Sequence, residues 1–253
     1  MDRVVAKIKE KKELSDIPDS LVGETLETYL RKNHLVIPQK EKELKIIIKE
    51  VRSHLRRYVG QYQSSASLSK KQRLLHEGKI SELLKTHAST RERASFYPKL
   101  KELIKKMNPK SILDLGCGIN PIAVASPGME YYAYEIKKDD LVLVAEFFKM
   151  SRIKGKTFFK DIRKESEFPK ADLTLMFKIL DIMEKDKYNF TKSLLEKINS
   201  KHIIVSFSTR TLSGKPMNAP RRLWFEKLLE ELKYKFTSIS SNNEIFYLIT
   251  RIA

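Results

Sequence analysis

Apolar residues in the first part of the chain recur three and four positions apart, from Asp2 to about Met107. This spacing is typical of amphipathic helices, and no convincing strand pattern interrupts it. The clearest helix is expected from about Lys40 to Val59. Its apolar stripe consists of Leu44, Ile47, Ile48, Val51, Leu55 and Tyr58. The pattern therefore predicts a helical domain that comprises residues 1–107.

After Asn108 and Pro109 the pattern changes to short β-rich runs that alternate with helical ones, which indicates a parallel sheet with crossover helices. The predicted strands cover 111–115, 131–136, 157–160, 173–177, 202–207, 236–240 and 245–249, with a helix over about 221–235. The last two strands flank an Asn242-Asn243 turn and form a hairpin. A terminal antiparallel pair is typical of class I methyltransferases, whereas simple NAD-binding domains remain parallel. We therefore predict an α/β, Rossmann-like domain with a seven-stranded sheet over residues 108–253.

The turn that follows the first predicted strand carries candidate cofactor chemistry. Gly116 and Gly118 allow backbone amides to approach a ligand where a Cβ would collide. A third glycine at the dinucleotide spacing is missing, so the turn favours an adenosyl group with a methionine tail, as in S-adenosylmethionine. Glu135, about 20 residues further on, ends the second strand and can accept both ribose hydroxyls. Asp161 follows the third strand, where it can reach the adenine amino group; each acid alone could equally be a surface carboxylate.

The chain is strongly basic, with 50 Lys and Arg against 32 Asp and Glu and a formal net charge of +18. Residues 1–108 alone hold 25 basic and 14 acidic side chains. Four basic residues form a second stripe on the 40–59 helix, and on an isolated helix such a stripe is more often a solvated face. The total charge favours a polyanionic partner, so we interpret the helical half as an RNA-docking domain. The candidate RNA-binding residues are Lys45, Lys49, Arg52, Arg56, Arg221 and Arg222.

Two features favour the cytosol. The first residues, Met1 to Leu14, lack the apolar core and cleavage site of a signal peptide, and no long apolar span or basic amphipathic terminus suits a membrane. The single cysteine, Cys117, permits no internal disulfide and no cysteine-based zinc site, so we expect no metal. We expect Cys117 to serve packing, because no histidine follows where a nucleophile pair needs one. We expect a monomer, since no heptad pattern is evident.

A set of short strings resembles one family. The segment from His87 to Arg93 has capping-box spacing between Ser89 and Glu92, which predicts a helix start. Together with other strings it also resembles the Arm/Rmt family of aminoglycoside-resistance 16S ribosomal RNA methyltransferases. Those strings are 60–62, 113–121, 177–180, 205–210 and 224–226. The match runs from about Arg52 to the C-terminus and keeps motif order and approximate spacing.

The resemblance implies methyl transfer from S-adenosylmethionine to N7 of a guanine in the decoding-site helix of 16S rRNA, with the assembled 30S subunit as substrate and aminoglycoside resistance as the result. It also implies that the helical region docks on this RNA. The implied cofactor-binding residues are Tyr62, His87, Ala88, Ser89, Arg93, Gly116, Glu135, Asp161, Ile162 and Ile179. Arg93 would clamp the methionine carboxylate. Lys178 and Arg210 would face the target nucleotide as catalytic residues, although Lys178 could equally be a strand-end lysine that reaches solvent.

The chain departs from the family between Arg210 and Trp224. Familiar members carry a Gly-Met-Glu-x-Asn-Tyr stretch there, whereas this chain has a shorter segment, Lys215 to Arg222, without the family's acidic residue. This difference leaves open how the target base is positioned and which nucleotide is modified.

The chemistry and the alternatives follow from the same residues. Guanine N7 carries a lone pair and no proton, so its methylation needs no general base. The Asn/Asp-Pro-Pro-aromatic motif of exocyclic-amine methyltransferases is missing after the fourth strand, where the chain reads Phe177-Lys178-Ile179-Leu180.

Two other functions stay open: a housekeeping rRNA or tRNA methyltransferase with a different target base, and a non-catalytic RNA-binding factor. A small-molecule methyltransferase fits the +18 charge poorly.

Overall fold

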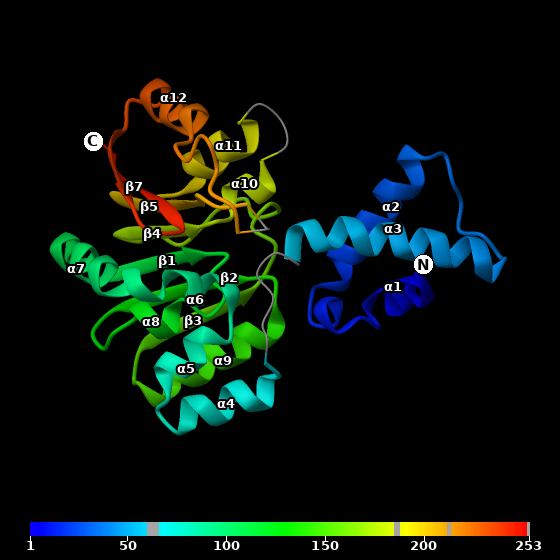
Figure 1. Ribbon diagram of the computed structural model, residues 1–253, viewed down its shortest axis with the longest axis horizontal. Helices are drawn as coiled ribbons and strands as arrows, with labels where there is room; N and C mark the ends of the chain where they lie inside the picture. The colour runs from blue at the N-terminus through cyan, green and yellow to red at the C-terminus, as the bar shows by residue number, and fades with distance from the viewer. Residues whose placement is uncertain (60–65, 185–187, 212–213, 252–253) are drawn as a thin grey trace.

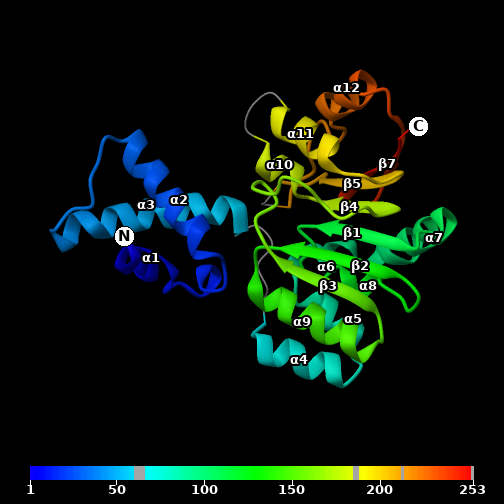
Figure 2. The same ribbon diagram turned by 180° about the vertical axis from the view of Figure 1, so that it is seen from behind.

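The computed structural model describes residues 1–59, 66–184, 188–211 and 214–251. It contains a helical N-terminal body and a larger α/β body, which lie side by side in the two opposite views of Figure 1 and Figure 2. None of the helices in these ranges combines the length and the apolar character that crossing a bilayer requires.

The N-terminal body is built from four helical segments around one apolar core. They are α1 (Asp2–Lys9), the 3-10 helix η1 (Lys12–Leu14), α2 (Asp19–Lys32) and α3 (Glu41–Val59). The apolar stripe of α3 is buried in this core, where Val51 and Leu55 are fully covered together with Ile8 and Leu26. The predicted long helix is therefore confirmed. Tyr58, the last predicted member of its apolar stripe, has a side chain outside the described part of the structure.

A second group of helices packs on the sheet rather than on the N-terminal body. The group consists of α4 (Leu68–His76), α5 (Ile80–Lys85), α6 (Ala88–Arg93), the 3-10 helix η2 (Ala94–Phe96) and α7 (Tyr97–Met107). Its residues Leu83 and Leu100 share one core with Ile112 and Tyr131 of the sheet. The apolar cores thus divide the chain between α3 and α4, and the predicted domain boundary at residue 107 does not coincide with this division. Helical periodicity is the same on both sides of the division, so the pattern could not show which helices cover the sheet.

The sheet has seven strands in the order β3-β2-β1-β4-β5-β7-β6. The strands are β1 (Ser111–Leu115), β2 (Glu130–Glu135), β3 (Lys154–Phe159), β4 (Leu173–Phe177), β5 (His202–Ser208), β6 (Lys235–Ser240) and β7 (Glu244–Thr250). The first five run parallel, and β7 pairs antiparallel with both β5 and β6. The remaining helices are α8 (Pro121–Val124), α9 (Lys138–Met150), α10 (Leu180–Met183), α11 (Asn189–Lys197) and α12 (Leu223–Glu231). The predicted Rossmann-like fold with a terminal antiparallel hairpin is confirmed.

Two element ends differ from the sequence prediction by more than two residues. Strand β3 begins at Lys154 instead of residue 157; it is an edge strand with partly exposed residues, so its apolar pattern is weak. Helix α12 ends at Glu231 instead of residue 235. There Lys233 adopts a left-handed φ of 57°, and the amides of Lys233 and Tyr234 bond back to Glu230 and Leu229 at 2.9 Å each. This is a Schellman-type helix end without the glycine that usually reveals one.

Polar contacts join the two bodies at the end of β2. The Nζ of Lys137 donates to the backbone oxygen of Glu13 at 2.9 Å and also pairs with Asp16. The amide of Lys138 donates to the backbone oxygen of Asp16 at 3.0 Å. Ile136 packs against the apolar core of the N-terminal body. The N-terminal body therefore touches the α/β body within two residues of Glu135.

Candidate cofactor and nucleotide sites

The turn between β1 and α8 is fixed by bonds to the end of β2. Gly116 and Gly118 have φ of 67° and 49°, a region that glycine adopts readily. A Cβ on Gly116 would lie 2.6 Å from Cγ2 of Ile179, so the glycine is also required by close packing. The amides of Gly116 and Cys117 donate to the backbone oxygen of Tyr134, at 2.9 and 3.0 Å. The start of the turn is thereby held to the end of β2.

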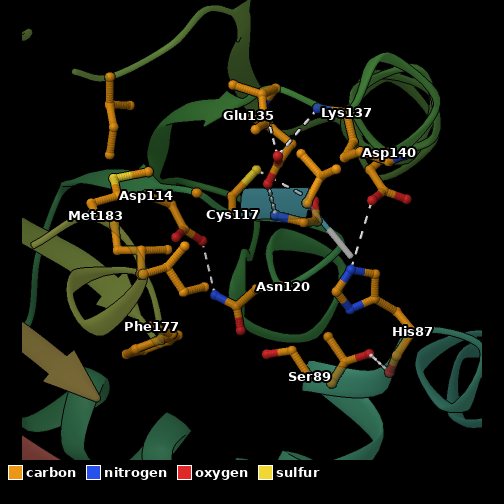
Figure 3. Close-up of a pocket in the computed structure, with 18 of the residues that line it drawn as sticks. His87, Ser89, Asp114, Cys117, Asn120, Glu135, Lys137, Asp140, Phe177 and Met183 are labelled. Atoms are coloured by element: carbon orange, nitrogen blue, oxygen red, sulfur yellow. Dashed lines mark hydrogen bonds and ion pairs between the residues drawn. The ribbon is translucent and has the colours of Figure 1, made fainter. Parts of the chain in front are cut away.

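A cavity of about 840 Å³, including its open mouth, lies beside this turn. Figure 3 shows its polar side chains converging from several elements. The sequence-predicted residues that line it are His87, Ser89, Arg93, Gly116, Glu135, Ile162 and Ile179. Ala88 and Asp161 are not among the lining residues, and Tyr62 lies outside the described residues. The structure thus brings most of the predicted cofactor residues together.

Glu135 lies at the centre of the hydrogen bonding in the cavity wall. Its Oε2 accepts from the amide of Gly118 at 2.8 Å, and its Oε1 accepts from the amides of Ile136 and Lys137 at 2.7 and 3.2 Å (Figure 3). Burial, and then the neighbouring Asp140, raise the pKa of Glu135 to about 7, although the three amides oppose the shift. The group therefore titrates near neutrality.

His87 carries an unsatisfied polar atom in the same wall. Its Nδ1 is buried and has no hydrogen-bond partner among the described residues, while its Nε2 lies 3.7 Å from Oδ2 of Asp140. Asp140 in turn pairs with the buried Lys71 at 2.6 Å. Burial lowers the pKa of His87, so the ring is neutral around pH 7. A buried ring nitrogen without a partner is costly unless a ligand supplies one.

Arg93 is almost fully buried and held on three sides. It pairs with Glu244 at 2.9 Å, and it donates to Ser89 at 3.2 Å and to Asn120 at 3.4 Å. Its guanidinium also lies 4.4 Å from the ring centre of Phe177. Burial alone would lower the pKa of Arg93, but Glu244 raises it, so the side chain is a permanent cation in the cavity wall.

Two residues near the turn have different surroundings from those predicted. Ser89 lies inside α6, whose N-cap is His87 without a side-chain cap bond, so the predicted capping box between Ser89 and Glu92 is wrong. Asp161 accepts from Nε of Arg163 at 2.9 and 3.0 Å, and it is not among the residues that line the cavity.

Cys117 packs in the core of the sheet, as predicted. Burial raises the pKa of its thiol, which makes it a poor nucleophile. Within the described residues no group of three His, Cys, Asp or Glu side chains could hold a metal ion.

A second cavity adjoins the first and contains both predicted catalytic residues, Lys178 and Arg210. The two cavities share one lining residue, Ile182. Lys178 is buried rather than directed into solvent: its Nζ pairs with Glu92 and lies 3.3 Å from Oε1 of Glu244. Since Glu244 also pairs with Arg93, one carboxylate links the two cavities. Glu244 was not predicted, because nothing near the hairpin turn indicates a partner far away in sequence.

Arg210 is held in the second cavity by backbone oxygens. Its Nη1 donates to Gly214 at 2.9 Å and its Nε to Asn242 at 3.3 Å. The side chain is exposed, in contrast to Lys178. The second cavity thus has a buried ammonium and an accessible guanidinium.

The predicted RNA-binding residues divide into two groups. Lys45 and Lys49 are exposed on α3. The four arginines take part in internal ion pairs: Arg52 with Glu10, Arg56 with Glu13, Arg221 with Glu226 and Arg222 with Asp181. Arg52 also donates to the backbone oxygen of Ile8 at 3.0 Å. Their charges are therefore partly compensated, and Arg52 helps to hold α1 on α3.

Comparison with known proteins identifies the family. Residues 65–248 match the family model described as ribosomal RNA methyltransferase (FmrO). The chain belongs to this family. The matched range contains the sheet up to Leu248 and every residue that lines the two cavities except Val59 of α3. It begins after α3, so it leaves out the N-terminal body of this FmrO-type chain.

Curated relatives carry one common name, 16S rRNA (guanine(1405)-N(7))-methyltransferase. The protein from Serratia marcescens is 28% identical over 219 residues, which cover 84% of this chain and 86% of the relative. The protein from Frankia casuarinae is 27% identical over 184 residues, or 68% of this chain and 64% of the relative.

Solved structures resemble the FmrO-type chain over nearly its whole length. The 16S rRNA methyltransferase RmtF in complex with S-adenosyl-L-homocysteine has a TM-score of 0.84 at 25% identity, with 99% of this chain and 98% of that chain covered. The 16S rRNA methylase RmtB has a TM-score of 0.79 at 23% identity with the same coverage, which shows the shared fold.

Proposed function

We propose that the protein transfers a methyl group from S-adenosylmethionine to N7 of a guanine in 16S rRNA. One observation carries the proposal: the cavity beside the β1 turn shares Ile182 with a second cavity that contains Lys178 and Arg210. A methyl donor in the first cavity and a nucleotide in the second would be neighbours. The family supplies the ribosomal RNA substrate, and the names of the relatives supply the base and the atom.

The first cavity suits S-adenosylmethionine by its donor and acceptor groups. In this proposal Glu135 accepts the ribose hydroxyls and Arg93 binds the methionine carboxylate, because a permanent buried cation suits a carboxylate. The unsatisfied Nδ1 of His87 would bond a polar atom of the ligand. Ile162 and Ile179 supply apolar wall. When bound, the sulfonium supplies an electrophilic methyl group.

The residues of the second cavity orient the acceptor rather than remove a proton. Guanine N7 has a free lone pair, so the chain needs no general base. Glu92 and Glu244 hold the ammonium of Lys178 in place, and Arg210 presents an accessible guanidinium to the base or its phosphate. Alignment of nucleophile and methyl group can account for up to about 7–11 kcal/mol of the barrier.

The proposed substrate is the decoding-site helix of 16S rRNA in the assembled 30S subunit, bound by a monomer in the cytoplasm. A base inside a helix must be extruded, at a cost on the order of a few kcal/mol. The N-terminal body and the basic charge of the chain would offset this cost through phosphate contacts.

A different target base is the second candidate. The segment before α12 favours it: Arg221 and Arg222 fold back onto Glu226 and Asp181, where family members carry an acidic residue. This segment adjoins the second cavity, since Asp181 lines it. The position of the modified nucleotide therefore decides between the two candidates.

The deciding experiment is methyl transfer to purified 30S subunits. The protein is incubated with S-adenosylmethionine labelled in its methyl group, and the modified nucleotide is mapped by mass spectrometry. We expect one N7-methylguanine in the decoding region. A label on another base supports the second candidate, and an absence of label with intact cofactor binding points to a non-catalytic RNA-binding factor.

A further inference from the structure

A partly exposed aromatic pair is formed by Tyr188, just before α11, and Trp224 of α12. The rings of Tyr188 and Trp224 are stacked, with centroids 5.1 Å apart and planes inclined by only 4°. Tyr188 remains 41% exposed, whereas Trp224 is partly buried. One face of the pair thus contacts the protein and Tyr188 is open to solvent.

The pair rests on a rigid aromatic base. Trp224 makes edge contacts with Phe207 and Phe225, at centroid distances of 5.8 and 5.5 Å. Both phenylalanines are fully buried and both contact Tyr247 of β7. Tyr188 itself has a left-handed φ of 72° and immediately precedes α11, where its backbone oxygen accepts from Lys192 at 2.9 Å. The backbone of Tyr188 is therefore fixed at the start of α11, and Trp224 supports the exposed ring from one face.

The pair is connected to the second cavity through Arg222. This residue lies two positions before Trp224, and its guanidinium lies 5.4 Å from the ring centre of Phe207. It also pairs with Asp181 at 2.8 Å and donates to the backbone oxygen of Ser208 at 2.9 Å. Asp181 and Ser208 both line the second cavity. Trp224 therefore lies two residues from a side chain that contacts two lining residues of the second cavity.

We propose that Tyr188, backed by Trp224, is a stacking platform for an unpaired nucleobase of the RNA substrate, separate from the base that is methylated. Extrusion of one base from a helix leaves a neighbouring or opposing base without its partner, and such a base stacks on an aromatic ring. Stacking is tolerant of sequence because each base has a π face. The net charge of +18 attracts the sugar-phosphate chain to the protein. The inference rests on the proposed RNA methyltransferase function.

The primary test uses substitutions at Tyr188 that separate the π face from bulk. Tyr188→Phe keeps the ring, Tyr188→Leu keeps an apolar side chain without it, and Tyr188→Ala removes both. Affinity for purified 30S subunits is measured in the presence of S-adenosylhomocysteine. We expect the Leu and Ala variants to bind roughly 5- to 150-fold more weakly, as for the loss of one stacked base, and the Phe variant to bind like wild type. Affinity for S-adenosylhomocysteine alone and the melting temperature are the folding controls.

A second measurement does not depend on methyl transfer. Trp224 is the only tryptophan of the chain, so its fluorescence reports directly on the pair. We expect a short single-stranded RNA oligonucleotide to quench this emission in wild type and in Tyr188→Phe, and much less in Tyr188→Leu. The inference is overturned if the folded Leu variant equals the Phe variant in both assays, because Tyr188 then only covers Trp224. If wild type fails to methylate 30S subunits but the oligonucleotide result holds, the proposed function fails and the platform stands.

Discussion

Glu244 and Arg93 form a buried ion pair, 2.9 Å long, between residues that are 151 positions apart in sequence. Both side chains are about 1% exposed. The pair joins the last strand of the sheet to the helix that enters the cofactor cavity. Removal of one member leaves a buried charge without compensation, which is among the most destabilising changes in a protein core.

Glu244→Gln is expected to lower the free energy of unfolding by about 3–5 kcal/mol. In the variant, Arg93 lacks the carboxylate partner that Glu244 provides. The carboxylate of a bound ligand would take the place of this partner. We therefore expect S-adenosylhomocysteine to raise the melting temperature of Glu244→Gln more than that of wild type. Glu230→Gln, at an exposed position of α12, is the control and should behave like wild type. An equal ligand shift in all three proteins would contradict the role of Arg93 as the carboxylate clamp.

Cofactor affinity should depend on pH through Glu135. Its pKa of about 7 is raised by burial, and an ionised carboxylate is the better acceptor for two hydroxyls. Bound cofactor therefore favours the deprotonated form, and affinity should fall as pH decreases below 7, approaching about tenfold per pH unit. Titration calorimetry from pH 8 to pH 5.5 measures this. His87 does not add to the fall near pH 7, because burial lowers its pKa.

The matching variant is Glu135→Gln. It should bind S-adenosylhomocysteine weakly at pH 8 and show a nearly flat pH profile. A slope as steep as that of wild type would mean that another group titrates on binding and that Glu135 does not contact the ribose.

Arg210 should act on the nucleotide and not on the cofactor. Arg210→Ala is expected to reduce methyl transfer to 30S subunits on the order of 100-fold, since loss of alignment at the reacting atoms has this effect. Binding of S-adenosylhomocysteine should stay unchanged, because Arg210 lines only the second cavity. Lys215→Ala, an exposed cation in the same segment, is the matched control and should retain most activity. A loss of cofactor binding in Arg210→Ala would be inconsistent with two separate cavities.

The basic residues of α3 should separate into docking and structural groups. Lys45 and Lys49 are exposed, so replacing both with Gln should reduce the salt dependence of 30S binding by about one unit of slope for each phosphate that the variant no longer neutralises. Arg52 binds backbone oxygens of α1, so Arg52→Gln should lower the melting temperature instead. If the double lysine variant keeps the wild-type slope, α3 does not contact the RNA backbone.

The sequence predicted elements with strong local patterns better than contacts between distant residues. The buried strands β1, β4 and β5 carry continuous apolar runs, and their ends were predicted to within about a residue. The turn at Gly116 and the acid at Glu135 follow from local spacing, so most of the cavity could be predicted. The helices α4 to α7 have the same periodicity as α1 to α3, so their attachment to the sheet could not be read from the pattern.

Ion pairs were the main part of the site that the sequence did not reveal. Arg56 pairs with Glu13, 43 positions away, and Arg222 with Asp181, 41 positions away. A basic residue looks the same in the sequence whether it is free for RNA or has an acidic neighbour in the fold. For this reason the candidate docking residues included arginines whose charge is already compensated.

The Asp16–Lys137 contact has a consequence for how substrate and cofactor act together. Lys137 donates its backbone amide to Glu135 and its ammonium group to the N-terminal body, so one residue belongs to both. In the proposed function, a shift of the helical body on RNA would act through Lys137 on the carboxylate that is proposed to hold the ribose. RNA and cofactor would then be coupled, and thermodynamic reciprocity would require each to change the dissociation constant of the other by an equal factor.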